Sequence, residues 1–176
     1  MIVQSGNDAA TALAEYIGGN ESSFVAQMNA TAERLGMDET HFENPTGWPA
    51  DGHVMSARDI ATLLSQLIHE FPDLYKVFRQ KSYTFNGIKQ YNREKLLFRN
   101  EWVDGGKTGH TEAAGYCLAT SGARDGMRLV AVVLGTESDE ARNNQAEALL
   151  NYGFRFFETV DVRGGGETLA TPRIYK

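Results

Sequence analysis

The spacing of apolar residues changes once along this chain, and that change limits the folds it can adopt. Up to about residue 78 apolar residues recur every three to four positions, as in helices. From about residue 83 they alternate with polar residues or form short apolar runs, and a helical pattern returns after residue 138. Helices, then strands joined by short turns, then one more helix predict an α+β fold with an antiparallel sheet.

Helix signals delimit three segments in the first half of the chain. The first predicted helix runs from about residue 7 to Gly18-Gly19, the second from about 20 to 35, and the third begins at Ser56. Asp59 follows Ser56 by three residues, which is the spacing of a capping box. A short helix is expected near residues 74–78. The expected apolar face of the first helix comprises Ala10, Leu13, Ala14 and Ile17.

Strand signals dominate from residue 83 onward. Asn86-Gly87 predicts a tight hairpin turn, and two later strands, near 115–121 and 129–135, are joined by Arg124-Asp125-Gly126. The second of these is continuously apolar from Val130 to Leu134, which is typical of a central strand covered on both faces. Ser138 caps a helix predicted to reach residue 158 and to cover the sheet. Its expected packing side comprises Leu149, Leu150, Gly153 and Phe157.

Composition excludes several classes of protein. The 17 basic and 23 acidic residues give a net charge of -6 without any basic run, which argues against nucleic-acid binding. Cys117 is the only cysteine, so the chain forms no internal disulfide and no multi-thiolate metal site. The four histidines lack compact metal-ligand spacing. We therefore expect neither a metal nor a cofactor.

Two short motifs carry the functional signal. Ser5-Gly6-Asn7 opens the first helix, and Lys107-Thr108-Gly109 lies on an extended segment before two strands. Alone, each is weak, because a serine at a helix start is usually a cap and a Lys-Thr-Gly tripeptide arises by chance. In this order, about 100 residues apart on a helix and a strand, they match the second and third elements of a serine acyl-transferase motif set.

The chain resembles the D-alanyl-D-alanine carboxypeptidases, the low-molecular-mass penicillin-binding proteins of peptidase family S11. The stretches that carry the resemblance are residues 2–10, 44–47, 56–59, 91–93, 103–116 and 153–158. It implies a β-lactamase/penicillin-binding-protein-like fold, with a helical subdomain and an antiparallel sheet covered by a C-terminal helix. Residues 1–160 would form part of the catalytic domain, and 161–176 a linker and the start of a truncated β-rich domain.

The resemblance also implies catalytic roles for three residues. In the family, a Ser-x-x-Lys motif supplies the nucleophile and its base. Ser5 would relay a proton between that lysine and the leaving amine. Asn7 would hold the substrate amide and the base lysine, and Lys107 would place positive charge near the substrate's terminal carboxylate.

Four further residues are implied in substrate binding. Thr108 would hydrogen-bond the terminal carboxylate, and Gly109 would let the substrate backbone lie against the strand as an added strand. The backbone N–H of His110 would form half of an oxyanion hole. Arg142, at the start of the last helix, would point toward the carboxylate pocket. Arg93 is a weaker candidate that we expect to be structural.

The chain departs from the family pattern in three places. None of its eight serines is followed by lysine three residues later, so the nucleophile motif is missing. The start is not typical of a signal peptide, and we expect an N-terminally truncated piece of a longer enzyme, with an apolar flank exposed on its sheet. Gly106 replaces a bulky apolar residue, and we expect it to forfeit packing against a helix. Glu94 replaces an asparagine, with no evident reason.

Three functions remain open on the sequence. The first is a serine-type carboxypeptidase that acts on peptidoglycan pentapeptides ending in D-Ala-D-Ala and is acylated by β-lactams. The second is a β-lactamase or esterase of the same fold, and the third a non-catalytic peptidoglycan-binding protein. The resemblance implies that the parent lies in the periplasm or on the outer face of the cytoplasmic membrane, with membrane contact only through segments outside this chain.

Overall fold

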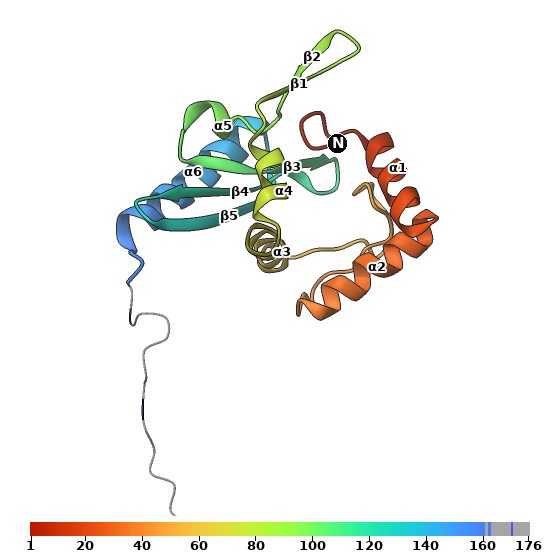
Figure 1. The fold of residues 1–176 in the computed structure, drawn as a ribbon, viewed down its shortest axis with the longest axis horizontal. Helices are drawn as coiled ribbons and strands as arrows, with labels where there is room; N and C mark the ends of the chain where they lie inside the picture. The colour runs from red at the N-terminus through yellow and green to blue at the C-terminus, as the bar shows by residue number, and fades with distance from the viewer. Residues whose placement is uncertain (161, 163–169, 171–176) are drawn as a thin grey trace, which may run out of the picture.

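A computed structural model describes residues 1–160, 162 and 170 of the chain. The predicted linker and second-domain start at 161–176 lie, apart from those two positions, outside the described residues. The rest forms a layer of two helices beside a helix-covered antiparallel sheet, with a protruding hairpin (Figure 1). The predicted α+β arrangement is confirmed.

The three predicted N-terminal helices form close to their expected bounds. They are α1 (Asn7–Gly18), α2 (Glu21–Arg34) and α3 (Ala57–Glu70). Gly19 ends α1 in the left-handed conformation, at φ 81°, where glycine lacks the steric cost of a Cβ. The expected apolar face of α1 is mostly not buried, because Leu13 and Ile17 are 46% and 59% exposed while Ala14 is fully buried.

The capping box predicted at α3 is only half formed. The Ser56 side chain accepts a hydrogen bond from the Asp59 N–H at 3.2 Å, as expected. The Asp59 carboxylate instead accepts from the Glu39 N–H at 3.0 Å and the Thr40 hydroxyl at 2.7 Å. Asp59 therefore ties the loop after α2 to the start of α3.

A helical turn and a hairpin connect the helices to the sheet. The helical turn, predicted near residues 74–78, comprises α4 (Pro72–Tyr75) and a 3₁₀ segment, η1 (Lys76–Arg79). Strands β1 (Ser82–Phe85) and β2 (Ile88–Tyr91) then pair around Asn86-Gly87, both of which have positive φ, as the predicted turn requires. A short helix that the sequence did not predict, α5 (Leu96–Arg99), leads into the sheet.

The main sheet has three antiparallel strands in the order β3-β4-β5. They are β3 (Val103–Thr111), β4 (Gly115–Arg124) and β5 (Met127–Thr136). Among the described strands β4 is central and β5, the strand with the apolar run, lies at an edge. A run of apolar residues reports cover on both faces, which α3 and α6 supply; it says nothing about how many neighbours a strand has.

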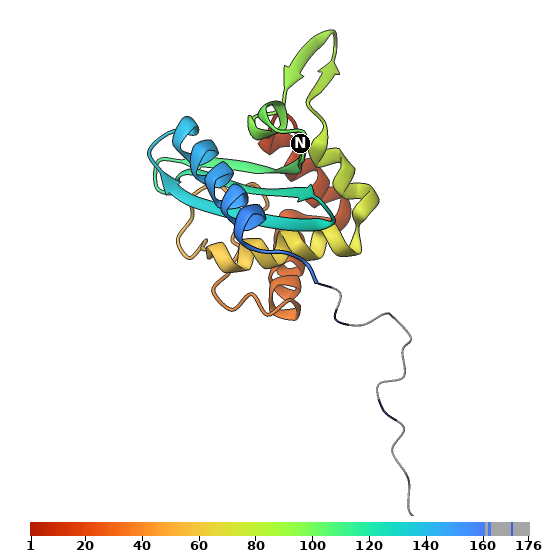
Figure 2. The ribbon, with the colours of Figure 1, turned by 90° about the vertical axis from the view of Figure 1, so that its left-hand side faces the viewer.

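Helix α6 (Asp139–Phe156) covers one face of the sheet, and α3 lies against the other (Figure 2). The Ser138 side chain caps α6 by accepting from the Ala141 N–H at 3.0 Å, as predicted. Its packing side is narrower than expected, because Leu150 is buried whereas Leu149 and Phe157 are 51% and 60% exposed. The buried core comprises Leu96, Leu97, Val103, Leu118, Ala131, Val133, Ala146 and Leu150.

Gly106 leaves no packing defect, and the expectation that it does is wrong. A Cβ at this position would lie 2.1 Å from the Ala119 carbonyl oxygen and 2.7 Å from the Thr120 Cα. These are backbone atoms of β4, which cannot move without disturbing the ladder. Glycine allows β3 to approach β4 closely just before Lys107.

None of the described helices is long and apolar enough to cross a membrane.

Candidate active site

Ser5 lies in a tight turn that precedes α1. Its φ of 60° is in the left-handed region, which is uncommon for a non-glycine residue, and its N–H donates to the Met1 carbonyl at 2.7 Å. The N-cap residue of α1 is Gly6, which has no side chain to cap with. The ordinary explanation of a serine at a helix start therefore does not apply, and the turn leaves the Ser5 hydroxyl free to point elsewhere.

The Ser5 hydroxyl meets Lys107, 102 residues further along the chain. Lys107 Nζ donates to Ser5 Oγ at 2.7 Å and to the Thr108 carbonyl at 2.6 Å. In β3, alternation places the side chain of Lys107 on the opposite face from those of its neighbours. The structure thus brings the two sequence motifs into direct contact through one serine and one lysine.

The surroundings of Lys107 disfavour the protonated form of its side chain. Burial, together with the nearby charges of Arg93 and Arg142, lowers the Lys107 pKa from 10.5 to about 8, while the charge of Glu94 acts in the opposite direction. A carboxylate placed beside such a lysine would compensate for the hydration that burial has removed from the ammonium group.

Strand β3 presents an unpaired edge beside Lys107. It pairs with β4 alone among the described strands, so its other edge can accept an extended peptide. Gly109 and His110 are exposed on this strand, whereas Thr108 is buried at 7% exposure. Asn7 is exposed in the first turn of α1, two residues from Ser5. Each motif therefore has an exposed residue close to the contact between Ser5 and Lys107.

Arg142 lies under β3, where it holds backbone in place. Its guanidinium donates to the Gly109 carbonyl at 3.0 Å and to the Cys117 carbonyl at 3.4 Å, and it pairs with Asp139. Its centre also lies 5.4 Å from the Tyr116 ring. These contacts hold the Gly109 backbone in place. The positive charge of Arg142 is also close enough to Lys107 to lower its pKa.

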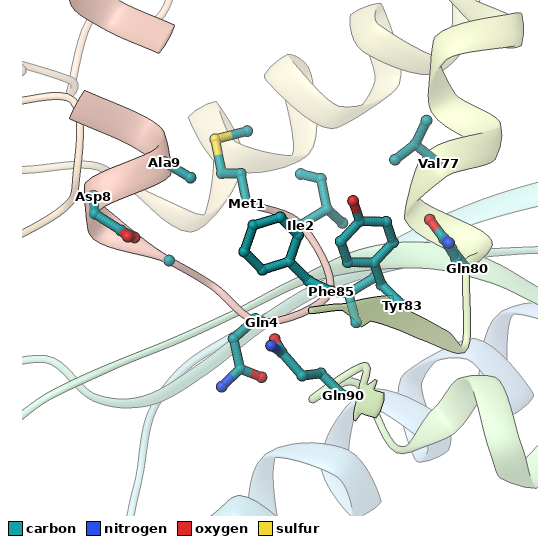
Figure 3. Close-up of a pocket in the computed structure, with 12 residues that line it drawn as sticks. Met1, Ile2, Gln4, Asp8, Ala9, Val77, Gln80, Tyr83, Phe85 and Gln90 are labelled. Atoms are coloured by element: carbon teal, nitrogen blue, oxygen red, sulfur yellow. The ribbon is translucent and has the colours of Figure 1, made fainter. Parts of the chain in front are cut away.

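A cavity of about 520 Å³ opens next to the Ser5 turn (Figure 3). The turn and the start of α1 form one wall, and the end of η1 with the β1–β2 hairpin forms the other. Tyr83 and Phe85 project into it from the hairpin, opposite Ile2, and Gln4 faces Gln90. Its lining is largely apolar and includes Gln4 and Gly6, the two neighbours of Ser5 in the chain.

Glu94 departs from the family pattern, but the sequence does not predict its burial. Glu94 is fully buried, and its carboxylate accepts a hydrogen bond from Thr120. Burial raises the Glu94 pKa from 4.5 to about 7, a shift that the Thr120 hydrogen bond opposes. The hydrophilic string Asn92-Arg93-Glu94 carries no signal of burial, and the replacement of an asparagine by Glu94 is the one sequence signal at this position.

The family profile described as D-alanyl-D-alanine carboxypeptidase, peptidase S11, matches residues 1–138. The chain belongs to this family. D-alanyl-D-alanine carboxypeptidase DacC of Escherichia coli K12 is 46% identical over 176 residues, or 99% of this chain and 44% of the relative. DacA of the same organism is 42% identical over 174 residues, or 98% of this chain and 43% of the relative. The S11 chain thus spans less than half the length of these curated relatives.

Solved structures confirm the S11 fold. The chain superposes on penicillin binding protein 5 from Haemophilus influenzae with a TM-score of 0.92 at 42% identity, covering 96% of this chain and 50% of that one. It also superposes on penicillin-binding protein D2 from Listeria monocytogenes in its ampicillin-bound form, with a TM-score of 0.79 at 34% identity. That match covers 85% of this chain and 63% of the other.

Proposed function

We propose that the parent protein is a serine-type D-Ala-D-Ala carboxypeptidase that cleaves peptidoglycan stem peptides through an acyl-enzyme. This chain contributes the proton relay and the carboxylate-binding strand, and a segment outside it contributes the Ser-x-x-Lys nucleophile and base. The observation that carries the proposal is the 2.7 Å contact between Lys107 Nζ and Ser5 Oγ. This contact places the two sequence motifs side by side.

The chemistry assigned to Ser5 is proton transfer. The nucleophilic serine attacks the carbonyl carbon of the penultimate D-alanine and gives its proton to the base lysine. As the tetrahedral intermediate collapses, the C–N bond breaks and the terminal D-alanine leaves. Its nitrogen takes up a proton that passes from the base lysine through the Ser5 hydroxyl. Water then hydrolyses the ester and releases the shortened peptide. The Lys107 contact holds the relay hydroxyl in place.

The binding assigned to β3 fixes the substrate backbone. The peptide lies along the free edge of β3 with its terminal carboxylate at Lys107 and Thr108, and Gly109 leaves room for its backbone. The His110 N–H and the N–H of the nucleophile stabilise the oxyanion. Asn7 holds the substrate amide and the base lysine. Arg142 contributes from beneath, through the Gly109 carbonyl and its positive charge near the carboxylate pocket.

Binding of β-lactams follows from the same chemistry. The match to the ampicillin-bound Listeria protein supports the proposal that the full-length parent is acylated by penicillin. We further propose a pentapeptide ending in D-Ala-D-Ala as the natural substrate and the periplasm, or the outer face of the cytoplasmic membrane, as the site of action. The name D-alanyl-D-alanine carboxypeptidase, which the Escherichia coli relatives carry, supports the choice of substrate.

Labelling with a fluorescent penicillin tests the proposed division of roles. The 176-residue chain should form no adduct that survives denaturation, whereas the full-length parent should. Rapid loss of the adduct from the parent would indicate a β-lactamase. A parent that never forms one would indicate a non-catalytic peptidoglycan-binding protein.

Removal of Lys107 tests the carboxylate site directly. A charge-assisted hydrogen bond in a buried site contributes about 1.5–3 kcal/mol. In the full-length parent, Lys107→Ala should therefore lower the second-order rate of penicillin acylation by roughly 10- to 100-fold. Lys107→Arg should retain part of the rate because the charge survives. Lys89→Ala, on the exposed hairpin, is the matched control. An unchanged rate in Lys107→Ala would remove Lys107 from the site.

A further inference from the structure

The buried carboxyl group of Glu94 is the feature that the proposed mechanism leaves unused. Glu94 is 0% exposed, one oxygen accepts from the Thr120 hydroxyl, and the other, Oε2, is buried with no hydrogen-bond partner among the described residues. Leaving a carboxyl oxygen buried without a partner destabilises the fold. A group retained at such a cost, close to a candidate site, calls for a functional account.

Hydrogen bonds of Asn92 fix the backbone that carries Glu94. The Glu94 N–H donates to the Asn92 side chain at 3.0 Å, and Asn92 in turn donates to the Gln80 carbonyl at 3.1 Å. The segment after the hairpin is thereby fixed against the end of η1. Thr120, the partner of Glu94, stands directly opposite Gly106 in the β3–β4 ladder. The Glu94 carboxyl group therefore lies behind the part of β3 that carries Lys107.

Lys107 otherwise has an excess of positive neighbours. Arg93 precedes Glu94 and Arg142 lies beneath β3, and both disfavour the ammonium form of Lys107. Within residues 1–160 no carboxylate lies within ion-pair distance of Lys107. Glu94 is the acidic group that favours the charged lysine, and Lys107 in turn favours the ionised Glu94, against the nearby charge of Asp104.

We propose that Glu94 is a positioning residue for the carboxypeptidase site, whose negative charge behind β3 keeps the Lys107 ammonium protonated between two arginines. This assignment rests on the proposed role of Lys107 in holding the substrate carboxylate. Gly106 is part of the same arrangement, because β3 lies close against β4 at the point where Thr120 holds the acid. The charge acts across the strand, without direct contact with the substrate.

The lysine pKa, measured by NMR on the chain itself, tests the coupling. The ε-methylene resonances of the lysines are followed from pH 6 to 11, and Lys107 is assigned by its loss in Lys107→Arg. Glu94→Gln keeps the shape and an acceptor for Thr120 but removes the charge. It should lower the Lys107 pKa by roughly 0.5–1 unit, the size of a charge–charge interaction across one strand. Glu147→Gln is the control: Glu147 lies on α6, its carboxylate pairs with Arg99 and Asn100 at the end of α5, and its replacement should leave the Lys107 pKa unchanged.

The reciprocal measurement keeps the inference testable if Glu94→Gln does not fold. Coupling between two sites is equal in both directions, so Lys107→Met should raise the Glu94 pKa by the same amount. It is read from the Glu94 carboxyl carbon. A Lys107 pKa that stays within about 0.2 unit in folded Glu94→Gln, or a Glu94 pKa that does not move in Lys107→Met, overturns the assignment. A purely structural Glu94 would move neither value.

The pH dependence of acylation separates this inference from the proposed function. In the full-length parent, Glu94→Gln should shift the high-pH limb of the penicillin acylation profile downward by the same fraction of a unit. If Lys107→Ala acylates normally, the proposed carboxylate site fails even where the two pKa values are coupled. If the coupling is absent while Lys107→Ala is impaired, Glu94 loses its role and the carboxylate site remains.

Discussion

Two regions of this molecule are built differently. We call β3, β4 and β5 with α5 and α6 the sheet half, and α1 and α2 with the turn before them the helical half. The sheet half, with α5 and α6, contains the whole buried core cluster, from Leu96 in α5 through Leu118 in β4 to Leu150 in α6. In the helical half the buried residue of α1 is Ala14 and that of α2 is Ala32, while Leu13, Tyr16 and Ile17 remain exposed. One half thus has its own core, and the other depends on what it packs against.

This difference places the candidate site at the junction of a stable and a weaker unit. Ser5 belongs to the turn that begins the helical half, and Lys107 belongs to the sheet. Both residues are held in unfavourable states, Ser5 by its backbone conformation and Lys107 by burial of its charge. The sheet can tolerate these costs because its core supplies the stability, so the site depends on the sheet half for its geometry.

Truncation of a core leucine should give the largest effect. Leu118 is fully buried in the central strand, and Leu118→Ala should reduce the free energy of unfolding by about 2–5 kcal/mol through lost burial and a cavity. Leu13→Ala in α1, where the side chain is 46% exposed, should cost less than about 1 kcal/mol. Urea unfolding followed by circular dichroism measures both. Equal losses would mean that the two halves share one core.

Addition of one methyl group to β3 should be the next most damaging change. Gly106→Ala places a Cβ against the β4 backbone and should destabilise the protein by about 1–3 kcal/mol through overpacking. Gly109→Ala is the matched control on the same strand, because its Cβ would lie 3.8 Å from the Cys117 Cβ, an ordinary contact. Thermal unfolding compares them. Greater stability in Gly106→Ala would mean that the strand has a vacant space there.

The error at Gly106 shows what the sequence could and could not predict. Periodicity, caps and turn residues are local, and they predicted every helix and strand except the short α5. The position of a strand within a sheet and the space around a glycine are set by distant segments. The apolar run of β5 therefore suggested a central strand, and Gly106 suggested lost packing against a helix.

The candidate site was predictable only in part for the same reason. Ser5 and Lys107 were selected because their motifs are specific as a pair, and the structure brings them together. Glu94 lies in a polar string, and its burial results from the Asn92 contacts and the approach of Thr120, which are tertiary features. Arg142 was selected by resemblance, but its two backbone carbonyl partners could not be inferred from its position in α6.

The stability of the protein should depend on pH because Lys107 titrates at a lower pH in the folded protein than in the unfolded chain. Because of this lowered pKa, the folded protein loses stability as the pH falls from about 10.5 through about 8. Lys107→Met removes this cost and should raise the free energy of unfolding at pH 7 by about 1–3 kcal/mol, a range that allows for solvent screening. Near pH 11, where the lysine is neutral in both states, the substitution should bring no gain. Urea unfolding at the two pH values measures it. A loss of stability at pH 7 would show that the ammonium group is favourably held.

Removal of the two helix caps should have the smallest effect and distinguish the halves most directly. Ser138 caps α6 through the Ala141 N–H, and Asn20 caps α2 through the Ser23 N–H at 2.8 Å. Each replacement by alanine should cost about 1 kcal/mol of helix stability. Because α6 covers the core, Ser138→Ala should lower the global free energy of unfolding. Asn20→Ala should instead speed amide hydrogen exchange within α2, with little change in the slowest exchanging amides of β4. If Asn20→Ala lowers protection in β4 as much as Ser138→Ala does, the helical half unfolds together with the sheet, and the two halves form one cooperative unit.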